Sequence, residues 1–137
     1  MSLAPATSNG TLVLDSEGLA KAVLRDTTVN EWLATAREEN ARVVTSAATL
    51  IEVVHPRIKM TALEWTLSRV NIAPVTESIS RDAIRLLHQA GLHGRKCAID
   101  AMVAATAHAA PPPVVVLTSD PGDLTRLCSE HIAVVKV

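Results

Sequence analysis

The residues of this sequence best suited to chemistry are acidic side chains that stand beside or inside apolar segments. Some directly follow short apolar runs, and others interrupt apolar stretches that have helical spacing. Charged side chains are almost never fully buried without a partner, so this placement points to a shared site. The five carboxylates are Asp15, Glu52, Asp100, Asp120 and Asp123.

A close cluster of such carboxylates needs a counter-charge. If four of them meet at about 5 Å, each pair repels by roughly 3 kcal/mol at an effective dielectric constant near 20. The six pairs together exceed the roughly 5 to 15 kcal/mol by which a small domain is stable. Some carboxylates must then take up protons, or a divalent cation must neutralise them. An all-oxygen ligand set suits Mg²⁺ or Mn²⁺, and such a site implies phosphate chemistry with a metal-activated water.

Each carboxylate also has a purely structural interpretation. Asp15 and Asp120 can be N-caps of the helices that follow them, the latter with Pro121 at the first helical position. Asp100 can complement a helix dipole. Glu52 can form a salt bridge with Arg57 or Lys59. Capping does not exclude ligation, because a carboxylate has a second oxygen.

Short apolar runs alternate with helical patterns along the chain. Strands are predicted at residues 11–14, 43–44, 71–75, 114–117 and 132–135. Helices are predicted from Ser16 through Leu24, at 28–40, from a Thr45 or Ser46 cap to Pro56, at 61–69, from a Thr76 or Ser78 cap to Gly91, at 97–109 and at 120–128.

This alternation predicts an α/β domain of three layers, with a mostly parallel central sheet of about five strands between helices. Residues 1–10 have the composition of a flexible N-terminal tail, and residues 11–137 form a single domain. Functional side chains of such sheets gather beyond the carboxyl ends of the strands. Asp15 and Asp120 are both expected there.

The composition narrows the classes of function. Among 137 residues there are two Trp and no Phe or Tyr, so the core must be aliphatic and an aromatic platform for stacking bases is close to excluded. A net charge of −1 argues against a general polycation. Cys97 and Cys128 are expected to be reduced packing residues, and the absence of a signal-peptide or membrane-spanning pattern predicts a cytoplasmic protein.

The motifs around these acidic residues resemble the PIN domain family, and in particular toxins of the VapC type. The similarity covers about residues 12–135. It rests on residues 12–16, on Glu52 after Thr45 and Ser46, on the helix 98–107 that contains Asp100, and on 118–124. One departure is Leu124, where the family commonly has Phe.

The resemblance implies a PIN-like fold and assigns roles to the acidic residues. Asp15, Glu52, Asp100 and Asp120 match the family's catalytic, metal-binding positions, and Asp123 matches a further acidic position. Thr118 or Ser119 matches a hydroxyl that orients the site. The family's toxins form homodimers, cut RNA with Mg²⁺ or Mn²⁺, and are inhibited by an antitoxin that inserts a peptide into the site.

Other residues have weaker claims to a role. Arg57, Lys59, Arg95 and Lys96 could hold an RNA backbone, although a solvated surface is the simpler interpretation because phosphate contacts have no motif of their own. His93 and His108 are acid-base candidates only by residue type.

Two other classes of function compete with a metal-dependent endoribonuclease. One is a catalytically silent PIN-like module that binds RNA or protein, which the intact acidic set disfavours. The other is a phosphoacceptor signalling domain, which needs an Asp at the end of the middle strand. Residues 72–76 contain none, so this class is disfavoured.

Overall fold

The computed structural model describes residues 9–137, and its centre is a five-stranded, wholly parallel sheet with strand order β3-β2-β1-β4-β5. This confirms the predicted α/β class. The strands are β1 (Thr11–Leu14), β2 (Arg42–Ser46), β3 (Asn71–Ala73), β4 (Val114–Thr118) and β5 (Ile132–Lys136). Of the predicted tail at residues 1–10, residues 1–8 lie outside the described residues, whereas the Gly10 carbonyl accepts a hydrogen bond from the Arg42 N–H at 3.0 Å.

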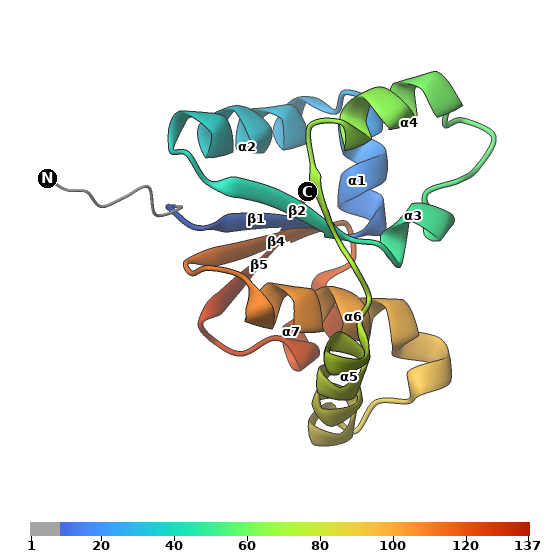
Figure 1. The fold of residues 1–137 in the computed structure, drawn as a ribbon, viewed down its shortest axis with the longest axis vertical. Helices are drawn as coiled ribbons and strands as arrows, with labels where there is room; N and C mark the ends of the chain where they lie inside the picture. The colour runs from blue at the N-terminus through green and yellow to red at the C-terminus, as the bar shows by residue number, and fades with distance from the viewer. Residues whose placement is uncertain (1–8) are drawn as a thin grey trace, which may run out of the picture.

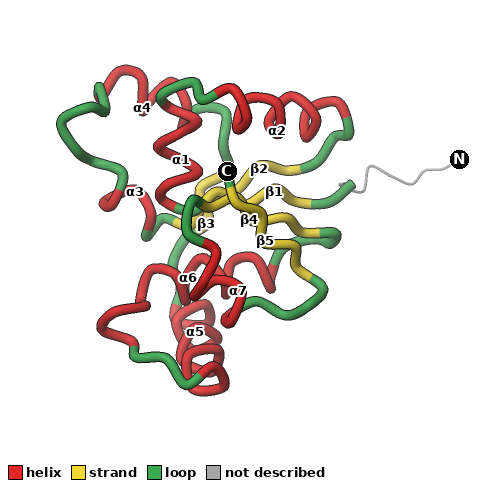
Figure 2. Tube along the Cα trace, turned by 180° about the vertical axis from the view of Figure 1, so that it is seen from behind, coloured by secondary structure: helices red, strands yellow, loops and turns green. Residues whose placement is uncertain are grey.

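Helices cover both faces of the sheet, as Figures 1 and 2 show. Helices α1, α2 and α4 lie on one face, helices α5, α6 and α7 lie on the other, and the short α3 follows the end of β2. The bounds are α1 (Ser16–Val23), α2 (Thr27–Glu38), α3 (Thr49–Glu52), α4 (Met60–Leu67), α5 (Glu77–Ala90), α6 (Gly94–Ala109) and α7 (Pro121–Leu127). No helix within residues 9–137 has both the length and the apolar character needed to cross a bilayer.

The two central strands divide the core into two aliphatic halves. Leu14 of β1 and Leu117 of β4 pack with α1, whereas Val13 and Val116 pack with α6 on the other face. Because successive side chains of a strand point to opposite faces, a strand covered on both sides is apolar at every position. This explains why β1 is buried throughout and why its sequence does not alternate.

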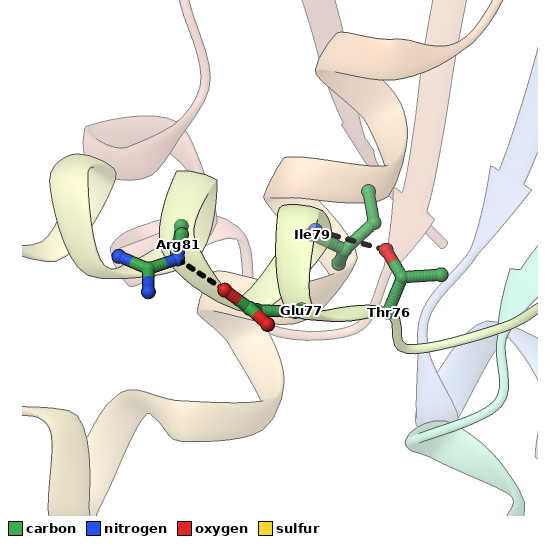
Figure 3. A network of polar contacts seen from close by, with 4 residues as sticks. All are labelled: Thr76, Glu77, Ile79 and Arg81. Atoms are coloured by element: carbon green, nitrogen blue, oxygen red, sulfur yellow. Dashed lines mark hydrogen bonds and ion pairs between the residues drawn. The ribbon is translucent and has the colours of Figure 1, made fainter.

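Helix α5 begins and ends as its sequence predicts, and Figure 3 shows the residues at its start. The Thr76 hydroxyl accepts a hydrogen bond from the Ile79 N–H at 3.1 Å, and Arg81 forms an ion pair with Glu77 at 2.7 Å. Gly91 ends the helix with φ of +67°, a left-handed conformation that glycine adopts without strain.

The prediction that a helix begins directly after a Thr45 or Ser46 cap is wrong. Both residues belong to β2, and the helical turn α3 starts only at Thr49, after Ala48, which makes no side-chain cap. The reason is tertiary: Thr45 pairs with Leu14 of β1 and with Ile72 of β3, and Ser46 pairs with Ala73, so the backbone stays in the sheet through Ser46. The Thr45 hydroxyl also donates to the Leu14 carbonyl of the neighbouring strand at 2.7 Å.

Residues 94–96 lie between the helix predicted to end at Gly91 and the one predicted to begin at residue 97, and they are helical in the structure. Gly94, Arg95 and Lys96 form the first turn of α6, and a kink with non-helical dihedral angles at Cys97 separates this turn from the long apolar segment. The sequence segment predicted as the helix, 97–109, is therefore the part of α6 beyond the kink.

Candidate active site

Asp15 is the most firmly held carboxylate at the carboxyl edge of the sheet. It directly follows β1 and is only 6% exposed, and its Oδ1 accepts a hydrogen bond from the Gly18 N–H at 2.7 Å, which makes it the N-cap of α1. Burial raises its pKa, while hydrogen bonds from Gly18 and the Thr118 hydroxyl act in the opposite direction. Asp15 thus serves as a cap and keeps a second oxygen for another partner.

Gly18 allows the first turn of α1 to approach the end of β4. A Cβ atom on Gly18 would lie 2.8 Å from the Leu117 carbonyl oxygen, closer than such atoms pack. The absence of a side chain therefore lets Asp15 lie beside Thr118, the last residue of β4.

Glu52 reaches the same edge from α3. Its carboxylate accepts a short hydrogen bond from the Ser16 hydroxyl, next to Asp15 in the chain. The Glu52 side chain is exposed, so the expectation of apolar surroundings is wrong: the apolar residues that flank it in sequence lie on other sides of this single turn. Within residues 9–137 neither Arg57 nor Lys59 forms the expected salt bridge with it.

Asp120 and Asp123 come from the β4–α7 connection. Asp120 is exposed and is the N-cap of α7, where its Oδ1 accepts from the Gly122 N–H at 3.4 Å. Its own N–H donates to the Thr118 hydroxyl at 3.0 Å. Asp123, in the first turn of α7, accepts a weak hydrogen bond from the Cys97 thiol at 3.6 Å.

Asp100 interacts electrostatically with all four of the other carboxylates. It lies in α6, three positions beyond the kink at Cys97, and is half-buried. Its pKa is raised to about 6, first by burial and then by repulsion from the other four carboxylates, in decreasing order from Asp15, Asp123, Glu52 and Asp120. Because Coulomb repulsion decays with distance, this pattern means that side chains from β1, α3, α6 and α7 share one electrostatic environment.

The carboxylates share this environment without forming a tight ligand set. Among residues 9–137, no three side chains of His, Cys, Asp or Glu lie close enough together to hold a metal ion as they stand. Glu52 and Asp120 are the exposed members, and each accepts a hydrogen bond from a nearby residue, whereas the N-capping Asp15 is buried.

The other predicted site residues differ in their placement. Thr118 is fully buried and hydrogen-bonds Asp15 and Asp120, whereas the neighbouring Ser119 makes no side-chain hydrogen bond among the described residues. All four basic candidates are exposed: Arg57 and Lys59 precede α4, and Arg95 and Lys96 lie in the first turn of α6. Their contact with RNA stays a prediction.

Both cysteines lie near the acidic edge as free thiols. Burial raises the pKa of Cys97, with a further contribution from Asp123. Burial and the charge of Asp100 raise the pKa of Cys128 to about 11. Both thiols are therefore protonated at neutral pH, which agrees with the packing role expected from the sequence.

Sequence reasoning missed the hydroxyl groups that support the site. Ser16 orients Glu52, and a buried pair, Thr45 and Thr49, connects β1 to α3. Thr45 contacts the Thr49 hydroxyl at 2.7 Å, and Thr49 also donates to the Ser46 carbonyl at 2.8 Å. Clustered hydroxyl residues before Glu52 were a visible signal, but a local cap explained them equally well.

We expect the Thr45→Val variant to lower the free energy of unfolding by about 1 to 3 kcal/mol. Valine keeps the shape but leaves the buried Leu14 carbonyl and Thr49 hydroxyl with one partner fewer. Urea unfolding, monitored by circular dichroism, measures the change. The exposed Thr61→Val variant in α4 is the control, and equal stability of the two variants would show that the Thr45 hydroxyl contributes nothing.

Comparisons with known proteins place the fold. No family model matches this sequence, and no curated protein matches it. The crystal structure of VapBC2 from Rickettsia felis bound to a DNA fragment from their promoter contains a similar chain, with a TM-score of 0.67 and 16% sequence identity, over 93% of this chain and 98% of that chain. The protein therefore has a PIN-like fold, with all five acidic residues on its carboxyl edge or facing it.

Proposed function

We propose that this protein is a cytoplasmic Mg²⁺- or Mn²⁺-dependent endoribonuclease that hydrolyses RNA phosphodiester bonds through Asp15, Glu52, Asp100 and Asp120. The observation that carries this proposal is the gathering of carboxylates from β1, α3, α6 and α7 at one edge of the sheet. Burial, and then repulsion from the other four carboxylates, raises the pKa of Asp100, and a divalent cation would relieve that repulsion.

The donor chemistry fits such an ion. All five groups are carboxylates, and hard oxygen donors suit Mg²⁺ and Mn²⁺. Asp15 and Asp100 would hold the ion from the buried side, and the exposed Glu52 and Asp120, together with the partly buried Asp123, would complete the site by rotation or through water. A bound ion would supply the positive charge that activates water and stabilises the phosphate oxygens.

The protein's own groups have separate tasks in this proposal. Asp15 is fixed by the Gly18 N–H and the Thr118 hydroxyl, so it provides a rigid reference point for the site. Asp100, with a pKa of about 6, is the carboxyl group that holds or releases a proton near neutral pH. Glu52 is oriented by Ser16 and faces solvent, where substrate would enter. The exposed residues Arg57 and Lys59, between α3 and α4, and Arg95 and Lys96, in the first turn of α6, would contact the RNA backbone.

We further propose that the protein is the toxin of a type II toxin–antitoxin pair and that it forms a homodimer. The similar chain belongs to VapBC2, and apolar side chains next to the acidic edge are unusually exposed in this protein. Ile51 is 82% exposed, Val54 59% and Met60 56%. Exposed apolar clusters of this kind are typical of surfaces that bind other proteins.

A catalytically silent RNA- or protein-binding module is the second candidate. The observation that favours it is the absence of a preassembled three-ligand metal group among residues 9–137. This silent module would have the same fold and would bind RNA or a partner protein, but it would not cleave RNA.

Metal-dependent cleavage distinguishes the two candidates. Purified protein is incubated with a structured RNA in Mg²⁺, in Mn²⁺ or in excess EDTA, and products are resolved on a denaturing gel. We expect cleavage with either ion and none in EDTA, with recovery when the ion is restored. Equal cleavage in EDTA would contradict the metal-dependent mechanism, and no cleavage under any condition would favour the silent module.

A further inference from the structure

A second polar site lies on the α1–α2–α4 face of the molecule, away from the acidic edge. A cavity of about 800 Å³ is bounded by the end of α1, by α2, by the end of α4 and by the first residues of β2 and β3. Four arginines line it, and no Asp or Glu does: Arg25, Arg37, Arg42 and Arg69. The three helices that frame it form a single layer in Figure 1.

The positive charge of this cavity is not neutralised internally. Within residues 9–137 the ion pairs are those of Arg81 and Arg85 on α5, so none of the four cavity arginines has a carboxylate partner within 4.0 Å. Four like charges around one hollow repel one another, and a bound anion would remove that cost. The guanidinium group presents several N–H donors in a planar fork that matches a phosphate group.

Trp65 holds two of these guanidinium groups in place. The Cζ atom of Arg69 lies 4.5 Å from the centroid of the Trp65 ring, and that of Arg25 lies 5.5 Å from it. Trp65 itself is 53% exposed. Stacking on an indole restrains an arginine while leaving its N–H edge able to donate. The Asn30 and Asn71 amides at the rim add donors and acceptors.

We infer that this arginine cavity binds the phosphodiester backbone of a single RNA strand, as a second contact for the substrate of the acidic edge. The inference rests on the proposed function for the identity of the strand. Helix α1 connects the two sites: it begins beside Asp15 and ends at Val23, directly after Ala22, which lines the cavity, and its eight residues span about 12 Å. A few nucleotides of extended RNA cover that distance.

An RNA strand fits this cavity better than an acidic protein segment does. A strand carries one phosphate per nucleotide and so meets several guanidinium groups with one chain, and its bases can stack on arginine planes or on the exposed part of Trp65. The carboxylates of the acidic edge repel the negatively charged RNA backbone. A positive surface elsewhere on the protein is therefore needed to bind the RNA.

Binding without cleavage tests the inference. Fluorescence anisotropy measures the affinity of a labelled 12-nucleotide single-stranded RNA in EDTA, at several salt concentrations, for the wild type and the Arg42→Ala/Arg69→Ala variant. Loss of two phosphate contacts should weaken binding about 20-fold near 0.1 M salt and reduce the slope of log affinity against log salt by about 1.4. The Arg81→Ala/Arg85→Ala variant removes the same charge from α5 and should bind within twofold of the wild type.

Two results would overturn the inference. One is an affinity of the Arg42→Ala/Arg69→Ala variant that equals that of the α5 control. The other is binding of a polyglutamate peptide that depends on Arg42 and Arg69 while RNA binding does not. Circular dichroism and thermal unfolding verify that both variants are folded. The experiment in EDTA measures RNA binding and not cleavage. Its result therefore does not depend on whether the protein is a nuclease.

Discussion

Replacing Asp15 with Asn should reduce RNA cleavage by about 1000-fold, which corresponds to roughly 4 kcal/mol of activation free energy, and should leave the fold intact. The amide oxygen of Asn can still accept the Gly18 N–H hydrogen bond that caps α1, and Asn is as good an N-cap as Asp. What the substitution removes is the negative charge at the buried centre of the acidic edge. The rate is measured by single-turnover cleavage in Mg²⁺.

Asp26 offers a matched control for this substitution. It caps α2 in the same way, with its Oδ2 accepting from the Val29 N–H at 3.0 Å, but it is remote from the residues that raise the pKa of Asp100. The Asp26→Asn variant should cleave RNA at the wild-type rate. If both variants retain wild-type activity, Asp15 acts only as a cap and the acidic edge is not the catalytic centre.

The placement of Asp15 and Asp120 could be predicted from sequence because parallel topology settles it. Once β1 and β4 are parallel neighbours, the residues that follow them must emerge at the same edge. The apolar runs in β1 and β4 make that topology predictable, since strands buried on both faces carry no polar alternation. The caps predicted for α1 and α7 follow from the same two residues.

The surroundings of Glu52 could not be predicted in this way. Its apolar neighbours in sequence indicated burial, but α3 is a single turn in which Ile51 is 82% exposed along with Glu52. Such a short helix depends on tertiary contacts rather than on its own periodicity. The pairing of β2 with β1 continues through Thr45, whose hydroxyl also donates to the Leu14 carbonyl, and no local pattern reveals a contact between residues 31 positions apart.

The Asp100→Asn variant should be more stable than the wild type in the absence of divalent ions at pH 8, by about 1 to 2 kcal/mol. The pKa of Asp100 is raised to about 6 from the ordinary value of about 3.9 for an aspartic acid, so between roughly pH 4 and pH 6 the folded protein binds more protons than the unfolded chain. The contribution of this group to stability therefore falls as the pH rises through that window. The full shift corresponds to about 3 kcal/mol, and partial exposure of Asp100 reduces it.

This pH dependence shows whether the charge of Asp100 is repelled by the other carboxylates or has no effect on stability. Urea unfolding in EDTA should show equal stability of wild type and variant near pH 3.5 and a gap that opens by pH 7. Added Mg²⁺ should narrow the gap, because an ion that binds the folded wild type stabilises it by mass action. The control, Asp82→Asn, removes a carboxylate that is ion-paired with Arg85 on α5 and should give no gain at pH 8. A variant that is less stable than wild type at every pH would mean that Asp100 stabilises the fold. That result would contradict the proposal that repulsion among these carboxylates destabilises the folded protein until a divalent ion binds.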